Sequence, residues 1–357
     1  MRLTLLHPHL AWTDGTARLV ETVRAAHDAG HEVQVLANPG SRTRAVLDAG
    51  GQVESCELPE HALLGYFAMR RTRARVHEHE PELLLATCGR LAPLLARTAD
   101  ALDLPSVLEL VRPPESRLEL PRRLRAVVVP SEAHVERAVN AGGIPRELLH
   151  VLEHGPHPGS AWVPPARLES RPPMIVAAGT LDREHGFDVL IEALRLFQRS
   201  GRTLGALVLG EGPEEEALRR QVREAELGDT ITIQCADVPD AGEVLAQADL
   251  FVAPTRSGDP GWITMQALTL GVPSILTATA STVGWIEDRR EGLLIERNDP
   301  AKLAQAIGLL LDNPAFARQL GAMGRVRLLE EQRDEGWRRG VCGLIEEAAA
   351  GAAVAAR

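Results

Sequence analysis

A loop that contains Gly and Pro, Thr255–Gly261, stands directly before an apolar helical stretch in the second half of the chain. It holds two glycines, one proline, one aspartate and one arginine. Backbone amides at the start of a helix have no partner inside the helix, and the helix dipole adds positive potential there. We therefore expect an anionic ligand to bind at this loop.

The surrounding stretch Leu250–Asp299 has the pattern of a strand, the loop, a helix, a second strand, a Gly-containing loop and a third strand. The whole second half repeats such alternation, and near-continuous apolar runs of this length are typical of buried parallel strands. Expected strands are "MIVAAG", "LGALVLG", "TITIQ", "LFVAP", "PSILT" and "GLLIE". Expected helices are Phe187–Arg199, Pro213–Glu226, Ala241–Ala248, Thr264–Leu270 and Pro300–Leu311.

The first half has the same α/β character. A strand at Leu3–Leu6, a helix at Thr16–Ala29 that ends at Gly30, and the alternating "HEVQVLA" make one βαβ unit, which implies a parallel sheet. Further strands are expected at Gln52–Glu57, Leu83–Ala86, Ser106–Leu110, Ala126–Val129 and Leu149–Leu152. The Pro-rich stretch Gly155–Pro173 has no periodicity and is typical of a linker.

These patterns predict an α/β chain with a first domain at 1–157, a linker at 158–173 and a second domain at 174–335. A helix at 336–357 either packs back on the first domain or frays. A chain of 357 residues exceeds what one hydrophobic core usually supports, which also favours two domains. Ligands bind such folds beyond the carboxyl ends of the strands.

Composition points to an ordinary globular protein, with 45% apolar and 25% charged residues. No window approaches the roughly 18 apolar residues of a membrane span, and no secretory cleavage pattern follows the start, so we expect a cytoplasmic protein. The net charge of −10 argues against general nucleic-acid binding. Four cysteines stand far apart, which predicts free thiols.

One basic segment interrupts this acidity. Four arginines follow the apolar "HALLGYFAM" within six residues: Arg70, Arg71, Arg73 and Arg75. A basic amphipathic helix of this kind can rest on the inner face of an anionic membrane or on an anionic acceptor. A solvated helix face is the alternative.

Five stretches of the second half resemble, in order and spacing, the retaining, nucleotide-sugar-dependent glycosyltransferases of the GT-B fold, the group 1 or family 4 class. They are Ala177–Leu194, Leu207–Arg220, "VLAQADLFVAP", "ALTLGVPSILT" and "EGLLIERNDPAKLAQAI". In the first half, "AHDAGHEVQVLA" and the segment from Ala126 to Gly155 are similar to the family, and Gly15 stands where the family has a paired-glycine loop. The resemblance implies two Rossmann-like, doubly wound domains that face a cleft.

The resemblance also implies a donor site. The family's Arg and Lys of the first loop match Thr180 and His185, and Arg183 lies in the same loop. The family's two glutamates match Gly258 and Gln266.

From these matches we predict Asp259, the carboxylate nearest to Gly258, and His185 as catalytic residues. Predicted donor-binding residues are Gly15, Thr180, Arg183, Glu211, Gly258, Gly261, Trp262 and Gln266. No Asp-x-Asp motif is present, and the resemblance implies no cofactor and no bound metal.

The implied function is transfer of a sugar from a nucleotide diphosphate to a hydroxyl acceptor with retention, in polysaccharide or glycolipid synthesis. The alternative is a catalytically impaired GT-B homologue that acts as partner or scaffold of an active glycosyltransferase, because the usual Arg, Lys and first Glu are replaced. A nucleotide-sugar epimerase on the same fold is a third hypothesis.

Overall fold

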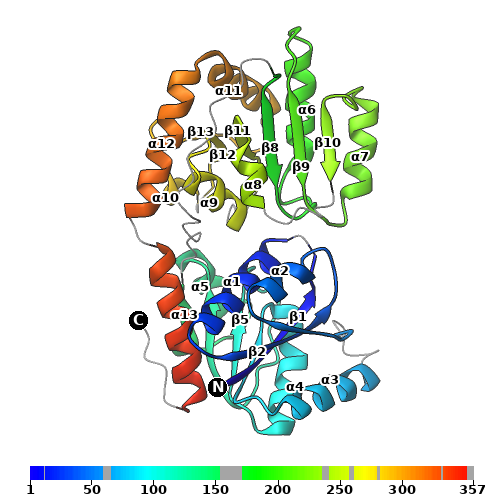
Figure 1. Ribbon diagram of the computed structural model, residues 1–357, viewed down its shortest axis with the longest axis vertical. Coiled ribbons are helices and arrows are strands. Elements are labelled where there is room, and N and C mark those ends of the chain that lie inside the picture. Colours follow the sequence, from blue (N-terminus) through cyan, green and yellow to red (C-terminus); the bar gives the residue numbers. More distant parts are fainter. Residues whose placement is uncertain are drawn as a thin grey trace. The chain divides into compact units, whose positions relative to one another are not determined.

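A computed structural model describes residues 1–11, 13–58, 66–152, 171–234, 241–256, 261–279, 282–330 and 333–351. The chain divides into two compact units, which are described separately below (Figure 1). Unit 1 comprises Met1–Ala11, Gly15–His154 and Glu335–Arg357, and unit 2 comprises Trp12–Asp14 and Gly155–Asp334. The expected linker lies mostly outside the described residues.

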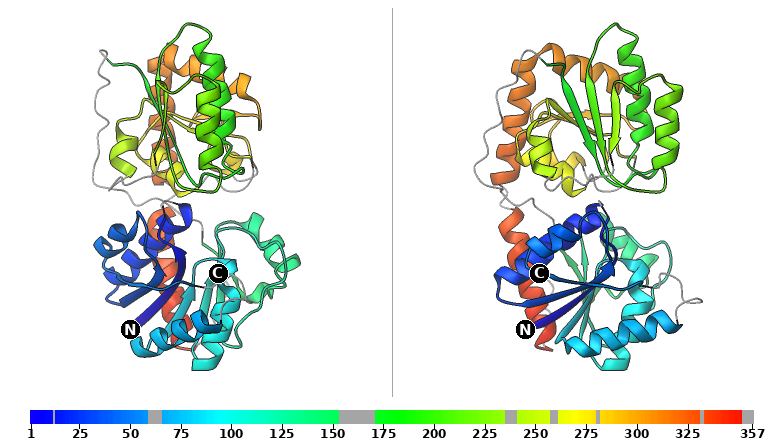
Figure 2. Two further views of the ribbon diagram at one scale, coloured as in Figure 1. Left: turned by 90° about the vertical axis from the view of Figure 1, so that its right-hand side faces the viewer. Right: turned by 45° about the vertical axis from the view of Figure 1, so that its right-hand side comes forward.

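The described part of unit 1 forms a seven-stranded sheet in the order β3-β2-β1-β4-β5-β6-β7, and all paired strands are parallel. Its inner strands are apolar almost throughout, because helices cover both faces of the sheet (Figure 2). The strands are β1 (Arg2–His9), β2 (Glu32–Asn38), β3 (Gln52–Ser55), β4 (Leu83–Ala86), β5 (Ser106–Glu109), β6 (Leu124–Val129) and β7 (Leu149–Val151).

Two apolar clusters lie on the two faces of this sheet. One joins α1 (Asp14–Asp28) to the C-terminal helix α13 (Arg333–Ala349), whose Trp337 is almost fully buried. The other joins α3 (Tyr66–His79), α4 (Ala92–Leu102) and α5 (Glu132–Asn140). A short helix α2 (Thr43–Asp48) and the 3-10 turns η1 (Gly89–Leu91) and η2 (Arg146–Leu148) complete the described elements of this unit.

Unit 2 repeats the architecture with a six-stranded sheet in the order β10-β9-β8-β11-β12-β13, again with parallel pairs. Its strands are β8 (Met174–Ala178), β9 (Gly205–Leu209), β10 (Ile231–Gln234), β11 (Leu250–Ala253), β12 (Ser274–Thr277) and β13 (Leu293–Ile295). Its helices are α6 (Phe187–Gln198), α7 (Glu215–Glu224), α8 (Ala241–Ala246), α9 (Trp262–Thr269), α10 (Thr282–Trp285), α11 (Pro300–Asp312) and α12 (Pro314–Glu330).

The predicted α/β class and the strands of both halves are confirmed, with boundary shifts of a few residues. One helix starts later than expected: α7 begins at Glu215 and not at Pro213, because residues 212–214 form a turn in which Glu214 N donates to Leu181 O at 2.9 Å. Helix α12 was not predicted. Its Ala317 and Leu320 are buried while Val326 and Leu329 are exposed, so its apolar residues give a weak helical signal.

In each sheet, the direction in which the chain adds successive strands reverses at one point. In unit 2 the chain runs from β8 to β10 toward one edge and from β11 to β13 toward the other, so β8 and β11 flank the switch point. In unit 1 the corresponding strands are β1 and β4. Loops that leave the carboxyl ends of such a strand pair diverge and leave room for a ligand. Both switch points are therefore candidate ligand-binding sites.

Candidate functional site

The loops after β8 and β11 contact each other through their backbones. Arg256 N donates to Glu184 O at 2.7 Å, and a Cβ added at Gly186 would lie 2.1 Å from Pro254 O. Gly186 has a positive φ of 66° at the start of α6, a conformation that favours glycine. The switch point therefore brings the two predicted donor loops together, although they are about 75 residues apart in sequence.

The loop after β9 joins the same arrangement on the other side of β8. Leu181 N donates to Glu211 O at 2.9 Å. A Cβ at Gly210 would lie 1.9 Å from Gly179 O, and one at Gly212 would lie 2.4 Å from Leu181 O. Glu211 and Thr180, both half-buried, thus lie in loops that are joined by close backbone contacts.

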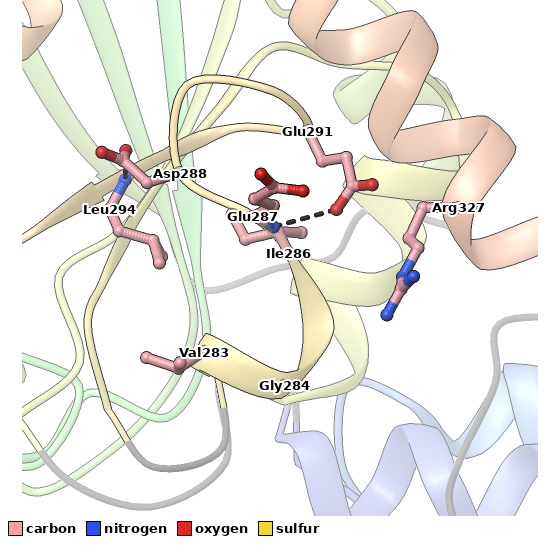
Figure 3. Close-up of a pocket in the computed structure, with 8 residues that line it drawn as sticks. All are labelled: Val283, Gly284, Ile286, Glu287, Asp288, Glu291, Leu294 and Arg327. Atoms are coloured by element: carbon pink, nitrogen blue, oxygen red, sulfur yellow. Dashed lines mark hydrogen bonds between the residues drawn. The ribbon is translucent and has the colours of Figure 1, made fainter.

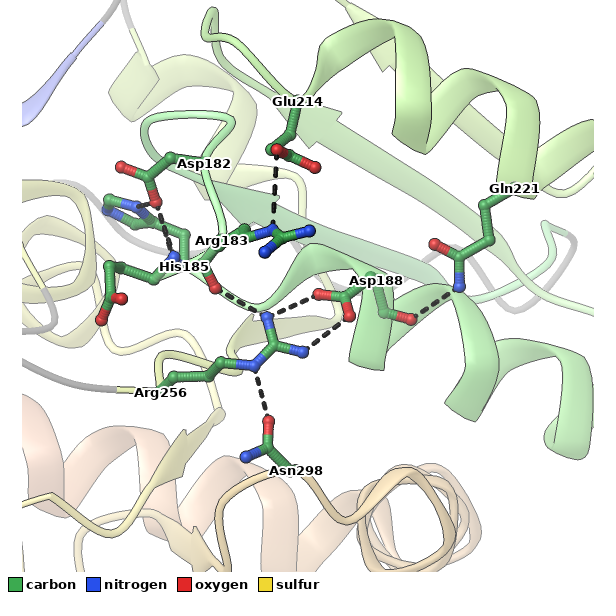
Figure 4. A network of polar contacts seen from close by, with 9 residues as sticks. Asp182, Arg183, His185, Asp188, Glu214, Gln221, Arg256 and Asn298 are labelled. Atoms are coloured by element: carbon green, nitrogen blue, oxygen red, sulfur yellow. Dashed lines mark hydrogen bonds and ion pairs between the residues drawn. The ribbon is translucent and has the colours of Figure 1, made fainter.

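His185 is held in place by Asp182 within the loop after β8. Its Nδ1 lies 2.8 Å from Asp182 Oδ1, which also accepts from the backbone amides of Glu184 and His185 (Figure 4). The ring is buried and stacks on Phe187 at 6.0 Å. Because a carboxylate only accepts, this contact places a proton on Nδ1 and directs Nε2 away from Asp182.

An arginine that the sequence did not single out connects three segments of this site. Arg256 donates through two nitrogens to Asp188 at 2.8 and 2.6 Å, and it also donates to Arg183 O and to Asn298 Oδ1, each at 2.6 Å (Figure 4). Burial of Asp188 disfavours its ionised form, but the hydrogen bonds and charge of Arg256 outweigh this and lower the pKa of the carboxyl. Arg256 therefore ties the loop after β11 to α6, a role that only its spatial neighbours reveal.

Arg183 differs from Arg256 in that its side chain is 86% exposed. Its nearest charged partner is Glu214, at 3.8 Å. A cation so exposed is available to an anion that approaches the loop, and it contributes little to the stability of unit 2.

Helix α9 begins after Gly261, which has a positive φ of 84°. Trp262 is partly buried against the core of unit 2, and the half-buried Gln266 follows one turn later. The predicted residues Gly258 and Asp259 lie outside the described residues. The start of α9 faces the carboxyl edge of the sheet, because α9 follows β11 directly.

At the switch point of unit 1, buried side chains link the strand ends to α1. His7, at the end of β1, lies 2.7 Å from Thr87 Oγ1 through Nδ1 and 3.0 Å from Thr16 Oγ1 through Nε2. Burial lowers the pKa of His7 to about 4, so its ring is neutral at physiological pH. Gly15, the predicted contact of this unit, is the second residue of α1 and adjoins Thr16.

A charged cluster lies beside this link. Arg18 of α1 forms an ion pair with Glu109 at the end of β5, and each is only 4% exposed. His134 of α5 lies 2.8 Å from Ser131 Oγ. Burial, followed by the charges of Arg18 and Arg137, lowers the pKa of His134 to about 4.

The arginines of α3 lie on its outer face. Thr72 and Val76 are buried on the inner face, whereas Arg70, Arg71 and Arg73 are exposed and form no ion pair within the described residues. Arg75 differs, because it pairs with Glu54 at 2.8 Å and with Glu78 at 3.4 Å. Three of the four predicted charges thus remain available to a partner.

A cavity of about 340 Å³ in unit 2 has none of the predicted site residues in its lining (Figure 3). Its carboxylates hold the turn before β13: Glu291 Oε2 accepts from Glu287 N at 2.9 Å, and Asp288 Oδ1 accepts from Leu294 N at 2.8 Å. It is lined by Val283, Gly284, Ile286, Glu287, Asp288, Glu291, Leu294 and Arg327. Since these carboxylates are engaged with backbone amides, we do not take the cavity as the functional site.

The described residues contain no cluster of three or more His, Cys, Asp or Glu side chains with the geometry of a metal site. Within the same residues, no helix combines the length and apolar character needed to cross a bilayer. Of the four cysteines, Cys56, Cys88 and Cys342 form no disulfide with one another, and Cys235 lies outside the described residues.

Comparison with known proteins places this geometry in a family. The family model described as glycosyl transferases group 1 matches residues 161–327. This segment belongs to the group 1 glycosyltransferases. It includes every donor-loop residue named above except Gly15, which lies in unit 1.

Individual relatives differ in how much of the chain they match. The lipopolysaccharide core biosynthesis glycosyltransferase LpsD of Rhizobium meliloti (strain 1021) is 23% identical over 90% of this chain and 92% of its own. The D-inositol 3-phosphate glycosyltransferase of Pseudarthrobacter chlorophenolicus is 29% identical over 46% of this chain and 40% of its own. The colanic acid glycosyltransferase WcaL of Escherichia coli (strain K12) matches over 42% of its length. The chain thus spans about two fifths of the length of these last two relatives.

Solved structures establish the fold of the whole chain. The Anabaena Alr3699/HepE structure in complex with UDP-glucose has a TM-score of 0.76 at 16% identity and covers 98% of this chain and 99% of its own. WaaG, a glycosyltransferase involved in lipopolysaccharide biosynthesis, has a TM-score of 0.75 at 13% identity and covers 97% and 99%. The expected GT-B fold, with two Rossmann-like parallel-sheet units, is therefore confirmed.

Proposed function

We propose that this group 1 glycosyltransferase transfers a sugar from a nucleotide diphosphate donor to a hydroxyl acceptor with retention of the anomeric configuration. The observation that carries the proposal is the backbone contact between the loops after β8 and β11 at the switch point of unit 2. This contact brings the loop that contains Thr180, Arg183 and His185 against the loop that leads from β11 toward α9. The names of LpsD and WaaG support a role in polysaccharide or glycolipid synthesis.

The chemistry requires stabilisation of a departing diphosphate while the sugar centre becomes cationic. The start of α9 supplies backbone amides, and Arg183 supplies an exposed positive charge. His185, oriented by Asp182, supplies a further donor, and a protonated ring adds charge. Asp259 is the proposed carboxylate near the donor sugar, and Gln266 is the proposed partner of the ribose hydroxyls. No metal or cofactor is needed for these roles.

Nucleotide binding tests the donor site. Gln266→Ala should weaken binding of UDP or GDP about tenfold, the loss expected for one or two hydrogen bonds. Gln198→Ala is the control, because Gln198 is exposed at the C-terminal end of α6, and this change should leave the affinity for UDP or GDP unchanged. Calorimetry that detects no UDP or GDP binding by the unmodified protein would rule the proposal out.

Turnover separates the enzyme from a scaffold. The replacements at Thr180, His185 and Gly258 motivate the alternative of an impaired homologue that acts beside an active glycosyltransferase. A donor-hydrolysis assay decides between them, because release of nucleotide diphosphate requires a working site. The anomeric configuration of a transferred sugar, measured by NMR, tests retention, and product analysis without an acceptor tests for an epimerase.

We also propose that unit 1 contacts an anionic membrane surface through Arg70, Arg71 and Arg73, at the cytoplasmic face. Each arginine near such a surface contributes about 1 kcal/mol, so the triple Arg→Gln variant should bind vesicles that contain phosphatidylglycerol about 100-fold more weakly. Arg199, Arg220 and Arg223 of unit 2 are exposed too, and their triple Gln variant is a control with the same change in charge. Equal binding by both variants would contradict the contact.

A further inference from the structure

The first turns of α1 are attached to the sheet of unit 1 at two buried points. Thr16 Oγ1 lies 3.0 Å from His7 Nε2, and the His7 ring reaches Thr87 beyond β4 through its other nitrogen. One half-turn later, Arg18 donates to Glu109 at the end of β5. Thus the side chains of one helix start are joined to the carboxyl ends of three adjacent strands, β1, β4 and β5.

The Arg18–Glu109 pair is poorly suited to a purely stabilising role. Both side chains are removed from water, and Arg18 Nη2 is buried with no hydrogen-bond partner among the described residues. Burying two charges costs solvation energy that the pair recovers only when the remaining donors are satisfied, and apolar replacements of similar volume are often neutral or stabilising. Stabilisation of the fold therefore does not by itself explain an ion pair with an unsatisfied hydrogen-bond donor.

Geometry supplies that explanation. A charged pair has a narrow range of distances and angles, because the planar guanidinium must meet the carboxylate in its own plane. Apolar packing between α1 and the sheet, through Leu19 and Val23, is non-directional and sets the position along the helix axis less narrowly. The ion pair fixes the height of α1 above the sheet edge, and with it the direction of the amides at Gly15 and Thr16.

We propose that Arg18, acting through Glu109, is a positioning residue that holds the start of α1 for the anionic group of the substrate. This inference rests on the proposed function and on the prediction from the family resemblance that Gly15 binds the donor. Arg18 does not touch the substrate itself, since its side chain is sealed from solvent. Its removal should therefore slow the reaction without weakening the donor affinity that unit 2 supplies.

The test uses a pair of variants, because Arg18→Met alone leaves Glu109 as an unpaired buried charge and should unfold unit 1 easily. The double variant Arg18→Met/Glu109→Met removes both charges and should melt close to the unmodified protein. We expect its kcat for donor turnover to fall about 100-fold, the cost of a misplacement of about 1 Å, with the Kd for UDP or GDP unchanged. Arg24→Met, which removes one ion pair of Glu21 on the same helix and leaves Glu21 paired with Arg338, is the control.

A readout without substrate keeps the two proposals apart. Hydrogen exchange of the segment 14–22 should be faster in the double variant than in the unmodified protein, and unchanged in Arg24→Met. Full activity in the double variant, or unchanged exchange in this segment, would overturn the positioning role. Absence of nucleotide binding and turnover in the unmodified protein would instead refute the proposed function, and the exchange measurement would still decide whether Arg18 positions α1.

Discussion

At the switch point of unit 2 the neighbouring loops are joined by backbone hydrogen bonds and close glycine contacts, whereas at that of unit 1 buried side chains join strand ends to a helix. The first arrangement depends on glycines and allows the outward side chains to change. The second depends on the identity of each buried polar group. Replacement of expected side chains at Thr180 and His185 is therefore compatible with an intact scaffold in unit 2, while unit 1 has less freedom at His7 and Arg18.

The largest loss of stability should come from replacing a glycine at the switch point of unit 2, where the loops are joined through their backbones. Gly186→Ala should destabilise unit 2 by about 4 kcal/mol, because the new Cβ would collide with Pro254 O and the backbone has a positive φ. Gly201→Ala isolates the second cause, since Gly201 also has a positive φ but an added Cβ there meets nothing within 4 Å, and it should cost about 1 kcal/mol. Urea unfolding of both variants measures the difference, and equal losses would contradict the collision.

The switch point of unit 1, where buried side chains join the strand ends to α1, should lose stability in acid. The folded-state pKa values of His7 and His134 are about 4, below the ordinary value of 6.5, so the unfolded chain binds protons that the folded chain excludes. Above about pH 6.5 the two rings are neutral in both states, so their burial carries no cost of deprotonation. The free energy of unfolding then falls as the pH drops from there toward 4. Each histidine should cost about 2 kcal/mol at roughly pH 5.

This acid response can be assigned by fluorescence of Trp337, which is buried in unit 1, during urea unfolding of a variant in which the other four of the five tryptophans are replaced by phenylalanine. His7→Gln should remove about 2 kcal/mol of the loss between neutral pH and about pH 5, because it removes one of the buried imidazoles of unit 1 with a lowered pKa, which are His7, His134 and His150. Unfolding of unit 1 that is independent of pH over this range would show that the rings are not held neutral.

A smaller effect is expected where unit 2 uses a side chain to connect its loops. Arg256→Lys should lower the stability of unit 2 by about 1 kcal/mol and weaken UDP or GDP binding several-fold, because an ammonium cannot reproduce the paired contact with Asp188. Arg195→Lys, in the surface pair with Glu192, is the matched control and should change neither quantity. Since the pKa of Asp188 is lowered, its contribution is complete at neutral pH and disappears as the pH falls through that lowered pKa.

The smallest change in stability should accompany a change in ligand affinity. Arg183→Gln removes a side chain that is 86% exposed, so the free energy of unfolding should change by less than about 0.5 kcal/mol. Affinity for UDP or GDP should nevertheless fall several-fold if this cation meets the diphosphate. Unchanged affinity, measured by calorimetry, would remove Arg183 from the proposed donor site.

Local patterns predicted much of the fold. Short apolar runs such as Leu83–Ala86 became buried parallel strands because burial on both faces requires continuous apolar sequence, a property that is visible without the structure. Helix α12 escaped prediction because its exposed Val326 and Leu329 blur the periodicity. The start of α7 was misplaced because a turn that depends on contact with Leu181 replaces its first residues.

The candidate site likewise contains residues that the sequence indicated and residues that only the structure revealed. Gly and Pro before an apolar helix indicated an anion-binding loop near Gly261, and the resemblance assigned roles to His185 and Gln266. Nothing in the sequence indicated that Arg256 would pair with Asp188, or that Arg18 would meet Glu109, because these partners are 68 and 91 residues apart.

The sequence by itself determined the α/β class and the succession of strands and helices along the chain, since these follow from the polarity and size of neighbouring residues. The tertiary structure alone decided which strands flank each switch point, which loops touch and which charges are buried. The physical reason is that strand order and burial depend on the packing of distant segments. A residue's neighbours in space, and not its neighbours along the chain, set whether its charge binds a ligand or holds the scaffold.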